Sequence, residues 1–243
     1  MISNLIEDGI NGTPIIPGDK SISHRSIIIP SISNGICEIN NILKSDDVMH
    51  TLEAFKSMGV KIIEENSKLI IHGKGLNSLK EPAEEIYLGN SGTSARLLTG
   101  LLSSQKFNSI LVGDKSLSNR PMKRISDPLK RMNAKIRTTN GSLPITIEGN
   151  ALVSSNIEIE IPSAQIKSGL ILASLNADGE TIITENKITR DHTETMLNSF
   201  EADIKIEKFN NKKIIKIVGK KELVSRNIDV PNDLSSSAFF IVA

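Results

Sequence analysis

Hydroxyl, lysine and arginine side chains recur at three points of the sequence where a strand pattern gives way to a helix pattern. The three groups are Lys20 with Ser21 and Arg25, then residues 90–93, then residues 163–165. A helix N-terminus carries unpaired N–H groups and the positive end of the helix dipole, so it attracts anions before any side chain contributes. Several such N-termini brought together predict a site for phosphate or carboxylate groups.

Two arginines precede later helices, Arg120 in the segment SNRPM and Arg190 in the segment ITRDHTE. The planar guanidinium fork binds phosphate or carboxylate through two parallel hydrogen bonds, whereas lysine offers a mobile point charge. Several fixed cations therefore indicate a ligand with more than one anionic group. The residues alone lead to a phosphate-binding α/β domain and do not name a reaction.

A purely structural interpretation of the same residues stays open from the sequence. Serine and asparagine at helix starts are commonly N-caps worth about 1 kcal/mol, and Arg25 could be a solvated surface arginine. A single histidine such as His24 is more often structural than catalytic. The recurrence at three equivalent positions favours the ligand-binding interpretation.

The elements that must position these side chains recur with a period of about seventy residues. Ser21, Ser91, Ser163 and Ser235 are separated by 70, 72 and 72 residues, and the pattern between them follows the order β-α-β-α-β-β. The sequence thus predicts an α/β fold of three units, with the helices packed inside the sheets, over roughly residues 17 to 230. The expected helices cover residues 20–29, 45–59, 91–102, 163–175 and 191–201, with another from 121, and the expected strands cover 35–42, 60–65, 68–73, 84–90, 109–114, 134–139, 143–149, 157–163, 180–185, 203–209 and 213–219.

Two prolines fall within these expected helices. Proline lacks an N–H donor and clashes with the carbonyl four residues earlier, so Pro30 should end or kink the first helix. For the same reason, Pro128 should split the stretch after Pro121 into a turn and a new helix start.

The composition restricts the class of protein. The chain has 243 residues and a formal net charge of +1, which supplies no broad positive field for nucleic acid or an anionic membrane. Aromatic residues make up 3% of the chain, so stacking platforms for single strands are scarce. One cysteine, Cys37, excludes an intrachain disulfide, and no apolar run suits a signal peptide or a spanning helix. The sequence predicts a cytoplasmic protein with no nucleic-acid or membrane partner.

Five segments carry a resemblance to a known family. PGDKSISHR, at residues 17–25, resembles the opening signature of the EPSP synthase family, the 3-phosphoshikimate 1-carboxyvinyltransferases. LGNSGTSARLL, NRPM, PSAQIKSGL and TRDHTE are similar to four further signatures of that family, in the same order. The segment PNDLSSSAFF, at residues 231–240, is similar to the one in which the family's chain returns to its other domain.

The resemblance implies two similar domains, each of three β-α-β-α-β-β units, with the active site in the cleft. Residues 1–16 would be a strand of the second domain, residues 17–230 the first enolpyruvyl-transferase domain, and residues 231–243 the return into a truncated second domain. The apolar helix pattern at the end of the sequence stops without a terminating signal. The family's acidic catalytic residues would lie beyond it, so we expect a truncated synthase that is inactive alone.

The resemblance also implies a reaction, in which the enolpyruvyl group of phosphoenolpyruvate passes to the 5-hydroxyl of 3-phosphoshikimate and phosphate is released. The reaction belongs to the shikimate pathway of aromatic amino-acid biosynthesis and needs no metal and no organic cofactor. The implied partners are the two small-molecule substrates, and the implied full-length form is a monomer. The expected catalytic residue is Lys20, the expected 3-phosphoshikimate contacts are Lys20, Ser21, Arg25, Ser163, Ala164, Gln165, Thr189 and Arg190, and the expected phosphoenolpyruvate contacts are Lys20, Gly92, Arg120 and Gln165.

Two other functions are alternatives to the transfer to 3-phosphoshikimate. The sister enzyme that acts on UDP-N-acetylglucosamine has a reactive cysteine in the loop before its Arg-Pro pair, where this sequence has Lys115 in GDKSLSNRPM. The one thiol here, Cys37, is distant in sequence and fits a small core residue. The second alternative is a non-catalytic half that binds phosphoshikimate.

Overall fold

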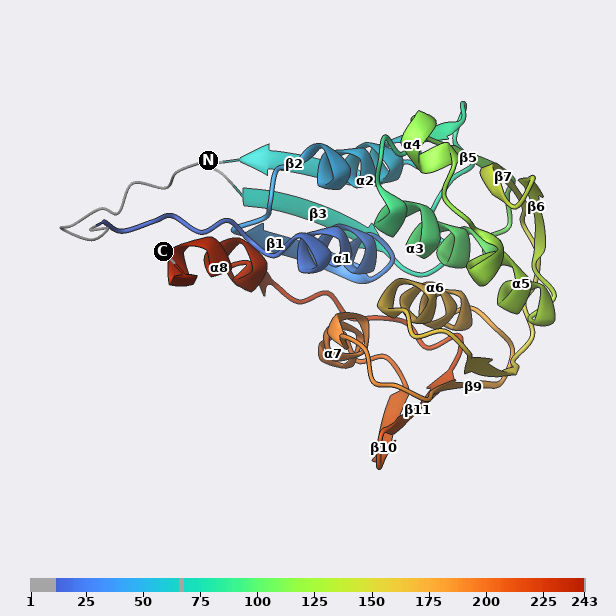
Figure 1. Cartoon of the computed structure of the whole chain (residues 1–243). Coiled ribbons are helices and arrows are strands. Elements are labelled where there is room, and N and C mark those ends of the chain that lie inside the picture. The colour runs from blue at the N-terminus through green and yellow to red at the C-terminus, as the bar shows by residue number, and fades with distance from the viewer. Residues whose placement is uncertain (1–11, 66–67, 243) are drawn as a thin grey trace.

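Three four-stranded sheets form the outer sides of the structure, and the long helices lie between them (Figure 1). The computed structural model describes residues 12–65 and 68–242. The strand orders are β12-β1-β3-β2, β4-β5-β7-β6 and β8-β9-β11-β10, and each sheet joins one parallel pair to antiparallel strands. The predicted α/β fold, with helices inside the sheets, is confirmed.

The elements of each unit follow the predicted order, with small shifts at their ends. The first unit contains α1 (Lys20–Ser31), β1 (Asn34–Asn40), α2 (Asp46–Ser57), β2 (Lys61–Glu65) and β3 (Lys68–Lys74). The second contains β4 (Ile86–Tyr87), α3 (Gly92–Ser103), β5 (Ser109–Val112), α4 (Lys115–Ser118), α5 (Lys123–Arg131), β6 (Lys135–Thr139) and β7 (Ser142–Glu148). The third contains β8 (Asn156–Ile159), α6 (Ala164–Ser174), β9 (Glu180–Glu185), α7 (His192–Ser199), β10 (Ile204–Phe209) and β11 (Lys212–Val218), and β12 (Ile228–Asp229) and α8 (Leu234–Val242) follow it.

The first sheet is completed by residues from far along the chain. β12 pairs in parallel with β1, so that Ile39 lies opposite Ile228. Nearby, the Asp19 N–H donates to the Pro231 carbonyl at 2.8 Å. The strand that the first predicted unit lacks is therefore supplied by the segment that follows the third unit.

The core helices α1, α3 and α6 are buried on nearly every side. Their sequences combine aliphatic residues with serine, alanine and glycine, which suits a helix surrounded by other elements. The backbones of α3 and α6 lie close together at Gly100 and Gly169. A Cβ atom on Gly100 would overlap the carbonyl oxygen of Gly169 and lie 2.5 Å from its carbonyl carbon. Glycine is therefore what allows the two backbones to touch.

The two predictions about proline have different outcomes. α1 ends at Ser31, one residue beyond Pro30, as expected of a terminating proline. The prediction for Pro128 is wrong, because this residue lies inside the unbroken helix α5. The neighbouring side chains of Ile125 and Leu129 are fully buried, and their packing outweighs the one backbone hydrogen bond that proline removes.

The two ends of the described chain lie apart from the three units. Residues 1–11 of the predicted N-terminal strand fall outside the described residues, and residues 12–16 form no regular element. α8 buries none of its residues, and Phe239 is 81% exposed.

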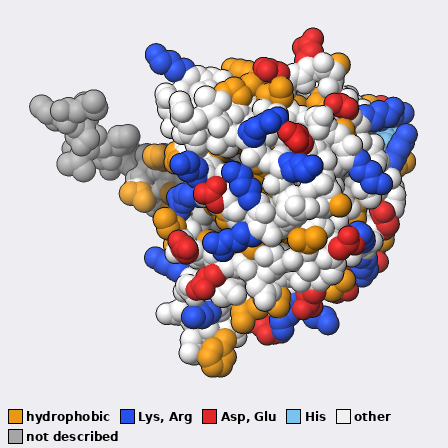
Figure 2. All heavy atoms as spheres, turned by 90° about the vertical axis from the view of Figure 1, so that its right-hand side faces the viewer, with side chains coloured by type: hydrophobic (Ala, Val, Ile, Leu, Met, Phe, Trp, Pro, Cys, Tyr) orange, Lys and Arg blue, Asp and Glu red, His pale blue; other side chains and the backbone are white. Residues whose placement is uncertain are grey.

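The face over the second sheet mixes basic and acidic side chains with scattered hydrophobic ones (Figure 2). In the described parts of the chain, each helix is too short or too polar to span a membrane.

Candidate functional site

The core helices α1, α3 and α6 each begin with a side-chain cap. Ser91 and Ser163 cap α3 and α6, as the structural interpretation of these serines expects. α1 is capped by Asp19, so Ser21 lies in the first turn of the helix and not at its cap. The cap oxygens of Asp19, Ser91 and Ser163 accept the N–H groups of Ile22, Ser94 and Ile166 at 2.8, 3.2 and 3.4 Å. The three caps are 72 residues apart at each step, which is the period of the repeat.

An open cavity of about 540 Å³ lies where these three N-termini meet. It brings together most of the residues that the sequence predicts as 3-phosphoshikimate contacts, since its walls include Ser21, Arg25, Ser163, Ala164, Gln165, Thr189 and Arg190. Thr93 of α3 also lines the cavity, so all three helices contribute to its walls. Ile188 and His192 also line the cavity, and sequence reasoning did not include them. The walls thus combine hydroxyls, an amide and two guanidinium groups.

Arg25 is held rigidly at the side of this cavity, although its side chain is 4% exposed. Its Nε donates to Thr193 Oγ1 at 2.6 Å and its Nη2 donates to Ser168 Oγ at 2.7 Å. Its Nη1 donates to the Ser21 carbonyl at 2.7 Å. A guanidinium fixed by three nitrogens can present its remaining N–H groups to an anion without losing further side-chain freedom.

The cavity has an excess of positive charge. Burial lowers the pKa of Arg25 to about 10; Glu194 and Asp19 oppose this shift, and the Arg190 guanidinium adds to it. Burial also lowers the pKa of His192, with the Arg25 guanidinium acting in the same direction. Burial is the main cause of both shifts, and no acidic side chain is among the described residues that line the cavity. A bound anion would supply negative charge there, which agrees with a phosphate site.

A second group of residues lies at the N-terminus of α3, beside the cavity. A Cβ atom on Gly92 would lie 2.7 Å from Arg96 Nη1 and 2.9 Å from Arg120 Nη1, so both guanidiniums cover this glycine. Arg120 donates to Asn90, and Arg96 Nη1 donates to Gln165 Oε1 at 3.0 Å. Gly92 and Arg120 do not line the cavity, but Gln165 connects them to it.

Arg96 is a residue of this group that sequence reasoning missed. It follows Gly92 by one helical turn in SGTSARLL, and this spacing on an anion-attracting N-terminus is the signal that could have identified it. Burial lowers the pKa of Arg96, and the nearby Arg120 and Arg124 add to the shift. The Arg96 and Arg120 guanidiniums, which both lie over Gly92, suit a second anionic group.

Lys20, the predicted catalytic residue, is the first residue of α1 and does not line the cavity. Its Nζ donates to Asp47 Oδ2 at 3.0 Å, and its side chain is 52% exposed. The pair joins the N-terminus of α1 to that of α2, since Asp47 lies in the first turn of α2. The lysine is therefore oriented by a carboxylate and accessible to a ligand.

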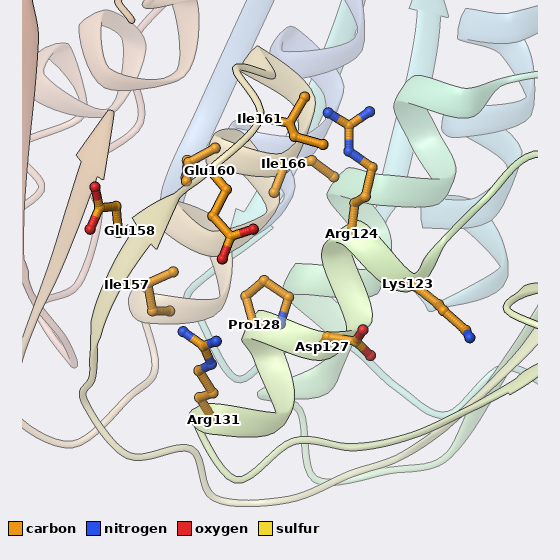
Figure 3. A pocket seen from close by; sticks show the side chains of 11 residues that line it. Lys123, Arg124, Asp127, Pro128, Arg131, Ile157, Glu158, Glu160, Ile161 and Ile166 are labelled. Atoms are coloured by element: carbon orange, nitrogen blue, oxygen red, sulfur yellow. The ribbon is translucent and has the colours of Figure 1, made fainter. Parts of the chain in front are cut away.

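Another cavity, of about 280 Å³, lies between α5 and the third unit (Figure 3). Its charged lining residues balance, with Lys123, Arg124 and Arg131 against Asp127, Glu158 and Glu160. The remaining lining is mainly isoleucine. Because its lining carries as many acids as bases, this cavity offers an anion less than the cavity at the helix N-termini does.

His24 lies in the core, next to the site but outside it. Its side chain is 0% exposed, and Nδ1 lies 2.8 Å from Thr51 Oγ1. Thr51 Oγ1 lies 2.6 Å from Ser94 Oγ, so a chain of polar contacts links α1, α2 and α3. No hydrogen-bond partner of Nε2 is found among the described residues. Burial lowers the pKa of His24 to about 3; Asp47 opposes this shift, and the positive charges of Arg25 and Lys20 add to it.

We expect His24 to make the protein less stable as the pH falls below 6.5. Between pH 6.5 and about 3 the unfolded chain binds a proton at His24 that the folded chain does not. The contribution of His24 to the free energy of unfolding is fully present above pH 6.5. It falls by about 1.4 kcal/mol for each pH unit below 6.5. Urea unfolding followed by circular dichroism at pH 7, 6 and 5 should show this slope, and His24→Gln should flatten it. An unchanged slope in that variant would contradict the assignment.

The described residues contain no evident metal site. Over residues 12–65 and 68–242, no three side chains of the His, Cys, Asp and Glu types come together in a way that could hold an ion. The functional groups that the site does contain are guanidiniums, an ammonium, hydroxyls and helix N-termini. These groups bind and orient anions and can assist proton transfer.

Comparison with known proteins gives consistent matches. The model of a family described as EPSP synthase (3-phosphoshikimate 1-carboxyvinyltransferase) matches residues 6–243. The 3-phosphoshikimate 1-carboxyvinyltransferase of Oenococcus oeni is 47% identical over 237 residues, which are 97% of this chain and 53% of that protein. The protein of the same name from Ruthia magnifica is 48% identical over 237 residues, with 97% and 54% covered.

Solved structures agree with these matches. The structure of the EPSP synthase from Acinetobacter baumannii superimposes with a TM-score of 0.89 at 49% sequence identity. The match covers 95% of this chain and 52% of that one. The chain thus spans about half the length of the curated relatives and solved structures that it matches.

Proposed function

The chain belongs to the EPSP synthase family, and we propose that it forms the 3-phosphoshikimate-binding part of an enzyme that transfers the enolpyruvyl group of phosphoenolpyruvate to the 5-hydroxyl of 3-phosphoshikimate. The observation that carries this proposal is the cavity at the N-termini of α1, α3 and α6. Its hydroxyls suit a polyhydroxylated ring, and its arginines suit a phosphate monoester. The proposed contacts are Lys20, Ser21, Arg25, Ser163, Ala164, Gln165, Thr189 and Arg190.

Phosphoenolpyruvate is proposed to bind beside this cavity, at the N-terminus of α3. The absence of a side chain at Gly92 lets an anion approach the backbone N–H groups, and Arg120 lies over the same glycine. Gln165 is shared by both sites, since its Nε2 donates to Thr93 Oγ1 at 3.0 Å and its Oε1 accepts from Arg96. Neighbouring sites of this kind hold two substrates at a fixed separation, which lowers the entropic part of the barrier.

The proposed reaction first adds the hydroxyl to the enol carbon: a base takes the hydroxyl proton, and an acid gives a proton to the methylene carbon, which becomes a methyl group. Phosphate then leaves as its bond to the former enol carbon breaks, and the methyl group loses a proton to a base, which restores the double bond of the enolpyruvyl group. Both steps require positioned acid and base groups in a site closed to water. Lys20 is the proposed catalytic residue of this chain, because its ammonium is exposed and already hydrogen-bonded to the Asp47 carboxylate. It would contact both substrates and either transfer a proton or stabilise developing charge.

The domain organisation remains part of the proposal. Residues 17–230 are proposed to form one enolpyruvyl-transferase domain, residues 231–243 the return into a second domain, and residues 1–16 a strand of that second domain. The hydrogen bond from Asp19 to Pro231, where the chain enters and leaves the three units, supports this division. The exposed apolar face of α8 is consistent with a helix that packs on a further domain.

The rival reaction on UDP-N-acetylglucosamine has less support. Cys37 is buried in β1, where its Sγ lies 2.9 Å from the Arg226 carbonyl, and it does not line the cavity. Burial raises the pKa of this thiol to about 12, and Glu38 adds to the shift. A thiol in this environment is a poor nucleophile.

We expect the 243-residue chain to bind 3-phosphoshikimate in a calorimetric titration, and to bind UDP-N-acetylglucosamine not at all. Arg190→Gln should weaken the binding of 3-phosphoshikimate by about tenfold or more, because a charge-assisted contact to phosphate is lost. Arg137→Gln is the matched control, since Arg137 is 76% exposed on β6 and paired with Glu148. Equal effects of the two substitutions, or no binding by the unmodified chain, would overturn the proposed site.

A coupled assay of phosphate release separates binding from turnover. Since the matched relatives are about twice as long, we expect the 243 residues alone to release no phosphate from 3-phosphoshikimate and phosphoenolpyruvate. Appreciable release without a second polypeptide would show that the complete catalytic machinery is present in this chain.

A further inference from the structure

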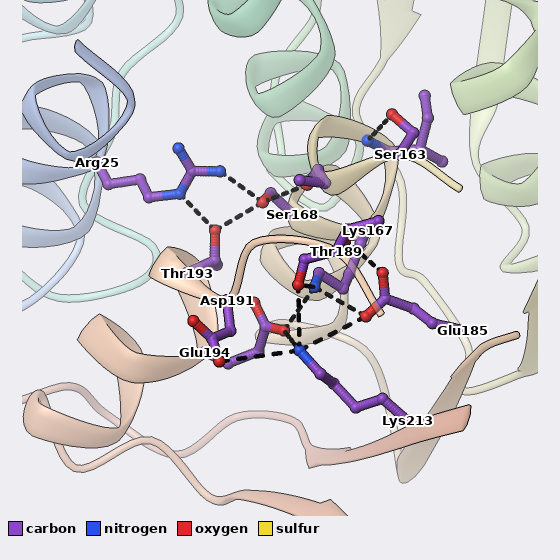
Figure 4. A network of polar contacts seen from close by, with 12 residues as sticks. Arg25, Ser163, Lys167, Ser168, Glu185, Thr189, Asp191, Thr193, Glu194 and Lys213 are labelled. Carbon is purple, nitrogen blue, oxygen red and sulfur yellow. Dashed lines mark hydrogen bonds and ion pairs between the residues drawn. The ribbon is translucent and has the colours of Figure 1, made fainter. Parts of the chain in front are cut away.

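Four buried charged side chains meet beside Thr189, a residue of the cavity wall, and form what we call the ion quartet: Lys167, Glu185, Glu194 and Lys213 (Figure 4). They come from α6, β9, α7 and β11, and their side chains are at most 1% exposed. Lys167 Nζ lies 2.9 Å from Glu185 Oε2 and 2.8 Å from Glu194 Oε1. Lys213 Nζ lies 3.6 and 3.3 Å from the same two oxygens.

Stability alone does not explain the ion quartet. Two ammoniums and two carboxylates balance in charge, but removing each of them from water is costly, and apolar residues of similar volume often serve as well. Glu194 Oε2 in addition has no hydrogen-bond partner among the described residues, which adds a further cost. Burial opposes the charged form of Lys213, yet Glu194, Glu185 and Asp191 outweigh it and raise the pKa of this lysine. The charged form of Lys213 is therefore favoured, and the contacts of the ion quartet point to a positional role.

The ion quartet holds the segment that carries Arg190. Lys167 Nζ and Lys213 Nζ both donate to the Thr189 carbonyl at 3.5 Å, and the Thr189 hydroxyl donates to Glu185 Oε1. The segment from β9 to α7, residues 186–191, has no regular secondary structure of its own. The bonds at Thr189, the residue before Arg190, therefore help to hold the segment in the cavity wall, together with the bond from Asn186 to Glu158 at its start.

The ion quartet also sets the surroundings of Arg25 through neighbouring residues. Ser168 follows Lys167 on α6, and Thr193 precedes Glu194 on α7. Both hydroxyls accept hydrogen bonds from Arg25, and the Thr193 hydroxyl donates to Ser168 Oγ at 2.7 Å. The Lys167–Glu194 ion pair therefore fixes the spacing of α6 and α7 one residue away from the atoms that aim Arg25 (Figure 4).

We propose that the ion quartet is a positioning device that aims Arg25 and Arg190 at a phosphate monoester dianion in the cavity. The inference rests on the proposed function, in which that dianion is the 3-phosphate of 3-phosphoshikimate. The four residues touch no substrate and act only through Ser168, Thr189 and Thr193. Their loss should weaken the recognition of the phosphate and leave the recognition of the ring largely intact.

The test compares binding of 3-phosphoshikimate with binding of shikimate, which lacks the phosphate. The main variant is the charge-balanced double substitution Lys213→Met with Glu194→Gln, which leaves the Lys167–Glu185 pair and no net buried charge. We expect the affinity for 3-phosphoshikimate to fall by about tenfold or more and that for shikimate to change by less than about threefold. Calorimetry measures the first ligand, and ligand-observed NMR the second.

Two control variants separate positioning from a general structural role. Lys216→Met with Glu207→Gln removes an exposed ion pair from the same sheet, where Lys216 Nζ and Glu207 Oε1 form a hydrogen bond of 2.6 Å, and it should change neither affinity. Lys213→Arg keeps the charge and should retain 3-phosphoshikimate binding to within about threefold. Circular dichroism and a thermal melt verify that each variant is folded.

A readout without ligand examines the segment itself. Lys187 and Arg190 are trypsin cleavage sites within residues 186–191. In the Lys213→Met with Glu194→Gln variant, cleavage there should become about tenfold faster than in the original chain, because opening of the segment is no longer opposed by its bonds. The exposed-pair control should show the original rate.

Each outcome has a defined meaning. The proposal is overturned if the charge-balanced variant is folded and binds 3-phosphoshikimate as the original chain does, or if both ligands weaken equally. It is also overturned if the cleavage rate at residues 186–191 does not change. If the original chain binds neither ligand, the proposed function fails, and the cleavage experiment still decides whether the ion quartet holds the segment.

Discussion

Replacement of Gly100 by alanine is expected to lower the free energy of unfolding by more than about 3 kcal/mol, which is a large part of the about 5–15 kcal/mol that stabilises an ordinary folded protein. The added Cβ would overlap the Gly169 carbonyl oxygen and lie 2.8 Å from the Gly169 Cα. These are backbone atoms of a neighbouring core helix, so a side-chain rotation cannot relieve the overlap. α3 and α6 would have to separate along their whole contact.

The sign of this effect makes it a sharp test. Glycine inside a helix is ordinarily about 1 kcal/mol less favourable than alanine, so helix propensity alone predicts stabilisation. Urea unfolding followed by circular dichroism at 222 nm measures the difference. Gly12→Ala is the control, because nothing lies within 4 Å of a Cβ at that position. A Gly100→Ala protein as stable as the original would show that the helices do not touch as described.

Replacement of Arg25 by alanine is expected to weaken 3-phosphoshikimate binding by about a hundredfold or more. The guanidinium is buried, fixed by three hydrogen bonds and located on the cavity wall. Burial and the Arg190 charge lower its pKa, and a bound phosphate would supply negative charge beside it. Its removal deletes both a charge and a fixed set of donors from the site.

Arg25→Lys distinguishes geometry from charge. Lysine keeps the positive charge but cannot reproduce the bonds to Ser21, Ser168 and Thr193 together, so binding should still weaken by about tenfold. Arg137→Lys on β6 is the matched control for the same exchange at an exposed ion pair. Calorimetry at one salt concentration measures all four proteins. Full affinity in Arg25→Lys would mean that only a positive charge is needed at this position.

The period of about seventy residues predicts which segments of the chain form the site better than it predicts which residue caps each helix. It places two of the three helix caps, Ser91 and Ser163, because a cap is a local interaction between residues three apart. At the first helix the repeated serine is Ser21, whereas the cap is Asp19. The offset of two residues places Ser21 in the first turn and on the cavity wall.

Pairing between distant elements lies beyond local sequence patterns. Lys213 lies in the strand KIIKIVG, where a lysine is ordinarily assigned to the solvent face. Its burial depends on ion pairs with Glu185 and Glu194. These two residues belong to other elements, and no local sequence pattern indicates that they lie near Lys213. β12 is likewise only two residues long, so neither alternation nor length could identify it as a strand.

The parallel pairing of β1 with β12 has a consequence for the order of events during synthesis. Ile39 is synthesised well before its pairing partner Ile228. At ordinary elongation rates of about 5–20 residues per second, the time between the synthesis of the two residues is roughly ten to forty seconds. During that time the outer edge of β1 presents unpaired backbone groups that other strands can add to. The edge of β1 is thus open to strand addition until residues 228–229 have been made and pair with it.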